Sequence, residues 1–327
     1  MKELIAGFGN QLRHALEIGE QAHLMESKKT IKNVVITGLG GSGIGGTMVS
    51  ELVAKNCSVP ILTNKGYHLP NFVNQDTLVI CSSFSGNTEE TLEAFNQARN
   101  MGSEIICISS GGQLIDLAKE NHLNHIQLPR AESPRAMMGY SVTQLFYSLE
   151  HYGLISNYFR SDISKSADLI DLYQEEIQAD AVKIANILEG KIPIIYACDG
   201  YEGMAVRFRQ QLNENSKMLA WHGIIPEMNH NELVGWRSKN EKLAVLFFKN
   251  KSDYIRNQKR IDINKQVISE YTSSVIEYSS KGESMIEQTF FLVNLGDHVS
   301  FLLSKMNGVI AEEIDVINKL KGALAKF

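Results

Sequence analysis

The sequence predicts an α/β protein made of two tandem domains, each with a doubly wound parallel sheet of the flavodoxin-like type. Short apolar runs of strand length alternate with helical patterns along the chain. Glycine-rich or hydroxyl-rich stretches directly follow two of these runs, as in folds that bind ligands at the carboxyl ends of their strands. The alternation pauses near residue 154 and restarts near residue 192. The 327 residues therefore suit two domains, which we place at 1–156 and 157–327.

The first domain is predicted to alternate strands and helices after an amphipathic helix at about 3–25. A polar stretch at 157–165 is the candidate linker to the second domain. The strands are expected at 34–36, 59–62, 77–81, 104–108 and 125–128, and the further helices after residue 43 and at 89–101, 112–120 and 137–154.

The second domain repeats this pattern at a nearly constant spacing. Strands that begin near Val34 and Leu78 have counterparts near Ile194 and Leu243, about 160 residues further on, which indicates a divergent internal duplication. The strands are expected at 192–198, 243–248 and 274–278, and the helices at 166–189, 202–219, 253–270 and 285–305.

Composition narrows the functional class. The net charge is −5 and no long basic run occurs, which argues against nucleic acid as a main partner. The chain shows no signal-peptide pattern, and its apolar runs are too short to span a membrane. Four scattered cysteines, Cys57, Cys81, Cys107 and Cys198, lack metal-site spacing and suggest reduced thiols. We therefore expect a cytoplasmic protein without a metal site or cofactor.

A hydroxyl-rich stretch follows the buried strand predicted at 77–81. Ser83, Ser85 and Thr88 occur in the pattern Ser-x-Ser-Gly-x-Thr, directly before a helix that starts at Glu89. Free backbone N–H groups and the positive end of the helix dipole favour a phosphate at such a position. The alternative is an ordinary helix cap, but a cap requires one hydroxyl rather than three. The spacing therefore predicts a phosphate-binding loop. Its counterpart in the second domain, at 249–252, reads Lys-Asn-Lys-Ser, so phosphate capture is assigned to the first domain.

A glycine-rich turn at 38–43 follows the first strand. Such a turn also occurs in dinucleotide-binding folds, which place an acidic residue about twenty positions further on. The corresponding stretch at 61–65 contains no acidic residue. We therefore expect Gly41 and Ser42 to offer backbone and hydroxyl groups to a small sugar or its phosphate.

Three charged or titratable residues are candidates for chemistry. Arg135 lies between two α/β elements, where it is either a surface residue or a fixed cation beside substrate oxygens. Glu214 lies late in a predicted helix between Asn213 and Asn215, both poor choices for a helix interior. His230 lies in a polar loop. A carboxylate and a histidine can perform acid–base chemistry near neutral pH, although a solvated helix end and a hydrated loop would look similar.

Five motifs, taken together, resemble one family. The chain is similar to the bifunctional phosphoglucose/phosphomannose isomerases of the phosphoglucose isomerase superfamily, which are built from two sugar isomerase (SIS) domains. The resemblance covers about residues 30–325 and rests on the order of the motifs. They read Gly-Leu-Gly-Gly-Ser-Gly, Ser-Ser-Phe-Ser-Gly-Asn-Thr-Glu-Glu-Thr, Pro-Arg-Ala, Asn-Glu-Asn-Ser-Lys and Pro-Glu-Met-Asn-His-Asn-Glu.

The resemblance implies a hexose 6-phosphate substrate that is interconverted between aldose and ketose, namely glucose 6-phosphate or mannose 6-phosphate with fructose 6-phosphate. Ser83, Ser85 and Thr88 match the family's phosphate loop. Gly41 and Ser42 match the glycine-rich turn that faces the sugar.

The resemblance also implies catalytic roles. Glu214 matches the base that moves a proton between C1 and C2, and Arg135 matches the arginine that steadies the enediolate. His230 matches the residue that opens the sugar ring, which reaches in from the neighbouring subunit of a homodimer with shared sites. Lys321, in the last predicted helix, matches a lysine that approaches the ring. The reaction requires no metal or cofactor.

One stretch departs from the family pattern. The family's tail reads Gly-Val-Asp-Pro-Thr before the last helix, whereas residues 308–312 here read Gly-Val-Ile-Ala-Glu. The family threonine, associated with the mannose epimer, therefore falls at Glu312. Two alternatives stay open at this point: an isomerase for another phosphosugar, and a non-catalytic SIS-domain sensor, which would need neither Glu214 nor His230.

Overall fold

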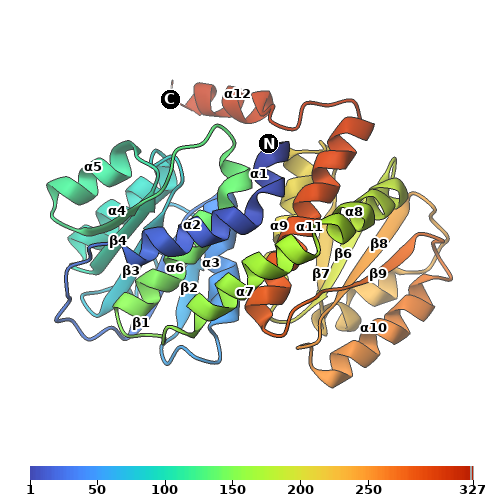
Figure 1. The fold of residues 1–327 in the computed structure, drawn as a ribbon, viewed down its shortest axis with the longest axis horizontal. Helices are drawn as coiled ribbons and strands as arrows, with labels where there is room; N and C mark the ends of the chain where they lie inside the picture. The colour runs from blue at the N-terminus through green and yellow to red at the C-terminus, as the bar shows by residue number, and fades with distance from the viewer. Residues whose placement is uncertain (325, 327) are drawn as a thin grey trace.

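The chain contains two parallel sheets that lie side by side with helices on their faces (Figure 1). The computed structural model describes residues 1–324 and 326. The first sheet has the order β2-β1-β3-β4-β5, which is that of the flavodoxin-like doubly wound fold. Its strands are β1 (Asn33–Thr37), β2 (Ile61–Asn64), β3 (Thr77–Ser82), β4 (Glu104–Ser109) and β5 (Asn124–Gln127).

The second sheet repeats the order of the first. It reads β7-β6-β8-β9, so that β6 and β8 occupy the positions of β1 and β3. All of its pairings are parallel. The fold class and the duplication are therefore confirmed, although β7 was not predicted because its Trp-His-Gly start lacks an apolar run. The strands are β6 (Ile192–Cys198), β7 (Trp221–Ile225), β8 (Leu243–Lys249) and β9 (Val275–Ser279).

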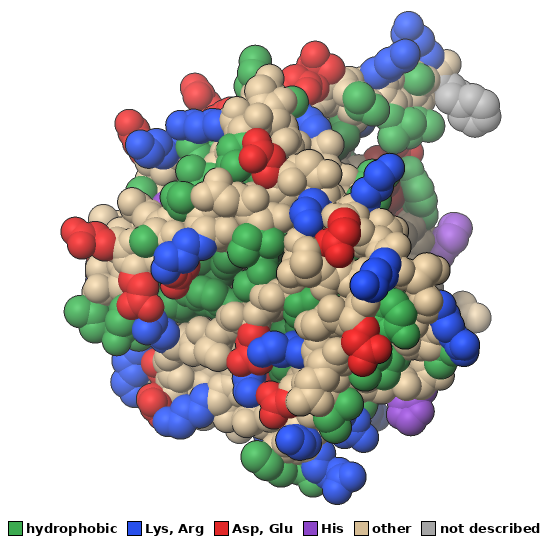
Figure 2. Space-filling view, turned by 90° about the vertical axis from the view of Figure 1, so that its right-hand side faces the viewer, with side chains coloured by type: hydrophobic (Ala, Val, Ile, Leu, Met, Phe, Trp, Pro, Cys, Tyr) green, Lys and Arg blue, Asp and Glu red, His purple; other side chains and the backbone are tan. Residues whose placement is uncertain are grey.

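Helices cover both sheets. None of those in residues 1–324 and 326 is long and apolar enough to cross a membrane. On the face drawn in Figure 2, basic and acidic side chains are interspersed. The helices of the first half are α1 (Lys2–Ala6), α2 (Phe8–Glu20), α3 (Gly40–Leu52), α4 (Glu89–Asn100), α5 (Gly112–Glu120), η1 (Pro134–Met137) and α6 (Met138–His151). Those of the second half are α7 (Tyr158–Leu172), α8 (Gln174–Leu188), α9 (Glu202–Glu214), η2 (Glu227–His230), η3 (Glu232–Gly235), α10 (Ile255–Ile268), α11 (Met285–Met306) and α12 (Asp315–Leu324).

The stretch predicted as a polar linker is helical. Residues 158–165 form the first half of α7, which packs against α2 of the first half and against α11. Phe159 and Ile163 are both fully buried, and their spacing of four places them on one face of the helix. The linker prediction was wrong because the many polar side chains obscured this face. We keep 1–156 and 157–327 as proposed domains, since each contains one sheet.

Helices α3 and α9 pack against each other between the two sheets. Glu51, in the last turn of α3, accepts hydrogen bonds from the backbone N–H groups of Glu202 (3.0 Å) and Gly203 (2.9 Å) at the start of α9. A Cβ on Gly203 would lie 2.9 Å from the backbone nitrogen of Met48, so the close approach requires glycine there. Because the end of α3 meets the start of α9, the start of α3 is directed toward the end of α9, where Glu214 lies.

Candidate active site

The two loops singled out from the sequence meet at one place in the first sheet. They follow β1 and β3, which are neighbours in the sheet although β2 lies between them in the chain. Open parallel sheets bind ligands at the carboxyl ends of strands where the strand order reverses in this way. The strand order alone therefore predicts a ligand-binding crevice at this edge of the first sheet.

The predicted phosphate loop has its hydroxyls at the start of α4. Ser83 is buried; its Oγ accepts the N–H of Gly86 (3.1 Å) and lies 2.8 Å from the Thr88 Oγ1. Thr88 is the N-cap of α4, yet its hydroxyl makes no capping hydrogen bond, while the Ser85 side chain is exposed. Gly86 has a φ of +71°, and a Cβ there would lie 1.8 Å from the carbonyl oxygen of Gly111. This loop can present hydroxyls and helix N–H groups to an anion.

The glycine-rich turn is shorter than predicted because α3 already begins at Gly40. A Cβ on Gly41 would meet no atom within 4 Å, so the backbone there is open to a ligand. Ser42 accepts the N–H of Phe84 at 3.3 Å and thereby ties this turn to the phosphate loop. Gly41, Ser42 and the three hydroxyl residues thus belong to one edge of the first sheet.

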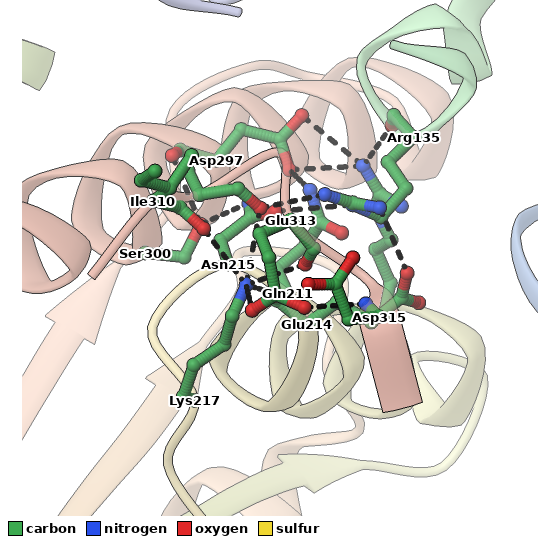
Figure 3. A network of polar contacts seen from close by, with 12 residues as sticks. Arg135, Gln211, Glu214, Asn215, Lys217, Asp297, Ser300, Ile310, Glu313 and Asp315 are labelled. Carbon is green, nitrogen blue, oxygen red and sulfur yellow. Dashed lines mark hydrogen bonds and ion pairs between the residues drawn. The ribbon is translucent and has the colours of Figure 1, made fainter. Parts of the chain in front are cut away.

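Arg135 and Glu214 form an ion pair between the two halves of the chain (Figure 3). Arg135 lies in η1, after β5, and Glu214 is the last residue of α9. The Arg135 Nη1 is 3.3 Å from the Glu214 Oε2; the two side chains are 14% and 29% exposed, respectively. The Arg135 Nε donates to the Asn215 Oδ1 (3.1 Å), and its Nη2 donates to the Ala311 carbonyl (2.7 Å). The guanidinium is therefore fixed on three sides, with a carboxylate beside it.

A second, deeper ion pair holds the backbone of Arg135. The Arg207 Nη2 donates to the Arg135 carbonyl (2.6 Å) and to the Asp297 Oδ1 (3.0 Å), and Gln211 also donates to that carboxylate (2.7 Å). The Arg207 and Asp297 side chains are only 3% and 4% exposed. Both charges are thus buried and paired with each other, while the Arg207 Nε has no hydrogen-bond partner among the described residues. Our sequence interpretation missed this network; the signal was an aspartate inside the apolar pattern of α11.

His230 and Lys321 lie apart from this ion pair. His230 is exposed at the end of η2, beyond the carboxyl end of β7. Glu214 ends α9, which returns from the carboxyl edge of the same sheet to its opposite edge, a run of about 20 Å for 13 residues. Lys321 is exposed on α12. Among the residues that the structure describes, no hydrogen bond or ion pair links His230 or Lys321 to Arg135 or Glu214.

We also looked for side chains that could hold a metal ion. Residues 1–324 and 326 contain no group of three or more His, Cys, Asp or Glu side chains arranged for this purpose. The polar groups at this edge of the first sheet include the hydroxyls and backbone N–H groups of the two loops and, after β5, the Arg135 guanidinium with the Glu214 carboxylate beside it. They can bind an anion and move a proton beside a stabilising cation.

Comparisons with known proteins agree on one family. Residues 177–324 match the family described as the bacterial phospho-glucose isomerase C-terminal SIS domain. The chain is 36% identical over 337 residues to the bifunctional phosphoglucose/phosphomannose isomerase of Caldicellulosiruptor bescii, with 100% of this chain and 99% of the relative covered. It is 31% identical over 299 residues to the D-glucosamine-6-phosphate 4-epimerase of Sulfolobus acidocaldarius, with 90% and 89% covered.

A solved structure shares the fold at low sequence identity. The C-terminal domain of glucosamine-fructose-6-phosphate aminotransferase from Francisella tularensis has a TM-score of 0.77 and is 14% identical, with 94% of this chain and 96% of that chain covered. This likeness concerns the fold alone, whereas the similarity to the Caldicellulosiruptor protein spans the full length of both chains. The chain therefore belongs to the bifunctional phosphoglucose/phosphomannose isomerase family.

Proposed function

We propose that this protein is an aldose–ketose isomerase that interconverts glucose 6-phosphate and mannose 6-phosphate with fructose 6-phosphate. Family membership supports the reaction class. The observation that carries the residue assignment is the Arg135–Glu214 pair, 3.3 Å apart, which joins a cation of the first half to a carboxylate of the second. It lies toward the edge of the first sheet that carries the hydroxyl loop.

The substrate phosphate is assigned to the hydroxyls of Ser83, Ser85 and Thr88. The N-terminus of α4 adds unpaired N–H groups and the positive end of its dipole. A sugar held there would extend over the open backbone of Gly41 and past Ser42. This orientation places C1 and C2 toward the end of α9.

The proton transfer is assigned to Glu214. Its carboxylate would take the proton from C2 of the aldose and return it to C1, while a proton moves from the C2 oxygen to the C1 oxygen. One carboxylate can perform both transfers because the two carbons are adjacent. The negative oxygen of the enediolate needs a preorganised cation, and Arg135 is held in place by three hydrogen-bonding or ionic partners.

Ring opening is assigned to His230 of the partner subunit in a homodimer. Within one chain, His230 and Glu214 lie toward opposite edges of the second sheet, so a two-fold partner is the simplest way to bring them together. Lys321, on the exposed α12, is proposed to approach the same ring. Such an interface should belong to the obligate class, of ~2,000 Å² or more.

A complementation experiment tests the shared site. Glu214→Gln and His230→Ala proteins, each inactive, are mixed under conditions that allow subunits to exchange. In the heterodimer, one site carries both lesions and the other carries none, so statistical exchange should restore about a quarter of wild-type activity. If exchange is demonstrated and activity does not return, or if a monomer is fully active, the shared-site assignment is wrong.

A second candidate function is the conversion of another phosphosugar. The observation that favours it is the relative named as a D-glucosamine-6-phosphate 4-epimerase, at 31% identity. Assays with fructose 6-phosphate, mannose 6-phosphate and glucosamine 6-phosphate separate the candidates. We expect glucose 6-phosphate to be the fastest product from fructose 6-phosphate, because Glu312 stands where the family threonine associated with mannose would be. Turnover of glucosamine 6-phosphate alone would select the second candidate.

A further inference from the structure

A residue just beyond the helix of the proposed base, three positions after Glu214, has an unusual backbone. Lys217 has a φ of +56°, in the left-handed region. It closes the end of α9, where the N–H of Met218 reaches back to the carbonyl of Leu212 at 3.2 Å. Helices that end in this way usually place glycine at the left-handed position, because glycine has no Cβ to clash. A residue other than glycine is uncommon there, so the contacts that the Lys217 side chain makes are informative.

The Lys217 side chain folds back against two segments of the chain (Figure 3). Its ammonium donates to the carbonyl of Glu214 (2.7 Å) at the end of α9, and to the carbonyls of Glu313 (2.8 Å) and Ile310 (2.9 Å) in the tail. A fourth carbonyl, that of Ala311, lies at 3.4 Å. An ammonium has three protons, so all of its donors are used. These hydrogen bonds join the end of α9, which carries the proposed base, to the tail.

Arg135 holds the same tail from its other side. Its Nη2 donates to the Ala311 carbonyl at 2.7 Å, while its Nη1 pairs with the Glu214 carboxylate. Lys217 contacts the backbone of Glu214, and Arg135 contacts its side chain. The stretch 310–313 is thus gripped by two cations, both of which also contact Glu214, and it leads directly into α12.

We infer that Lys217 is a positioning residue, which clamps the tail onto the end of α9 and thereby sets the distance between Glu214 and Arg135. The inference rests on the proposed function, since it assigns Lys217 a part in placing the proposed base. Removal of the clamp would leave the carbonyls of Glu214, Ile310 and Glu313 to water and loosen the tail, which Arg135 would still hold at Ala311. A small displacement of a catalytic group is enough to lower turnover ~10²-fold.

Three substitutions and a matched control test the clamp. Lys217→Gly removes the ammonium and relieves the backbone, Lys217→Met removes the ammonium alone, and Lys217→Arg retains a cation that can donate to carbonyls. His122→Gly is the control, because His122 has a φ of +52° at the end of α5 and does not contact the site. We expect the Gly and Met variants to lose ~10²-fold in kcat with KM changed less than ~3-fold, and Lys217→Arg to recover most of the loss.

Amide hydrogen exchange supplies a readout that does not depend on turnover. Exchange at 310–313 should accelerate in Lys217→Gly and Lys217→Met but not in His122→Gly. Wild-type kcat in Lys217→Gly, or unchanged exchange in the tail, would overturn the clamp.

A double variant separates this inference from the proposed function. In a Glu214→Gln background, Lys217→Gly should cause no further loss, because both changes act on the same group. Losses that multiply would show that Lys217 acts elsewhere, and would overturn the inference. If Glu214→Gln alone turned over normally, the assigned base would be wrong, whereas the tail exchange in Lys217→Gly would still report on the clamp itself.

Discussion

Each half of the duplicated fold has a strand edge where a ligand-binding cleft is expected, and these two clefts are equipped in opposite ways. The first lies at the carboxyl edge of the first sheet, with the loop after β3 and the end of α9. The second lies at the carboxyl edge of the second sheet, with the loop after β8 and the end of α3. In the first cleft, the Thr88 hydroxyl makes no capping bond to α4. In the second, the Glu51 carboxylate binds the N–H groups of Glu202 and Gly203 at the start of α9.

The loop after β8 is also occupied by the protein itself. Asp253 accepts the backbone N–H of Asn250 at 2.7 Å. The second cleft keeps a cavity of about 600 Å³, but its helix start and its loop are both bonded to carboxylates of the chain. Because a bound carboxylate competes with a phosphate for the same donors, we assign the substrate phosphate to the first cleft. In the second cleft, Glu51 and Asp253 thus already occupy backbone donors of the helix start and of the loop.

The largest expected difference between the clefts is in turnover. Glu214→Gln removes the proposed base while keeping its size, so kcat should fall by ~10²–10⁴-fold at nearly constant KM. Glu51→Gln makes the same chemical change in the last turn of α3, and kcat should stay within ~2-fold. A coupled assay of fructose 6-phosphate measures both. Near-normal turnover in Glu214→Gln would mean that Glu214 and Glu51 behave alike, and would contradict the assignment of Glu214 as the base.

The second expected effect is on stability and concerns Glu51. Burial raises the pKa of Glu51 from 4.5 to about 7. The folded protein therefore retains a proton that the unfolded chain releases. This contribution is complete below pH ~4.5 and is lost as the pH rises through ~7, with a total of at most about 3 kcal/mol.

Glu51→Gln cannot titrate, so it should flatten the dependence of Tm on pH between about pH 5 and 8. Calorimetry of both proteins across this range measures the difference. Parallel curves for wild type and variant would show that Glu51 does not titrate there.

The smallest expected effect is on substrate affinity. Thr88→Val keeps the shape of the side chain but removes one hydroxyl from the phosphate loop. A hydrogen bond to a charged group contributes about 1.5 kcal/mol or more, so KM should rise ~10-fold with kcat little changed. Ser252→Ala is the matched change in the loop after β8, and KM should stay within ~2-fold of wild type. Equal effects in the two loops would contradict the assignment of the phosphate to the first cleft.

The sequence predicted those features of the fold that depend on residues close together in the chain. The apolar runs at β1, β3, β6 and β8 revealed the sheets, because each buried strand reads as a continuous apolar stretch. Ser83 and Thr88 were singled out because a helix cap requires one hydroxyl rather than three, and their phosphate-binding role stays a prediction. Polar composition was a poorer guide, since it concealed the buried face of α7.

Contacts between segments that are far apart in the chain could not be predicted from local sequence patterns. Arg207 and Asp297 are 90 residues apart, and nothing near either one identifies its partner. The clamp of Lys217 depends on a left-handed φ and on carbonyls of the tail, and both emerge only when the chain is folded. His230 was proposed from a resemblance, and the fold adds the physical reason that it lies away from Glu214 in its own subunit.

A crystal structure of the Glu214→Gln protein with fructose 6-phosphate, which this variant should bind without converting, tests where the substrate lies. We expect the phosphate to lie against Ser83, Ser85 and Thr88, with C1 and C2 of the sugar between residue 214 and Arg135. A phosphate bound only in the second cleft, against the loop after β8, would contradict it.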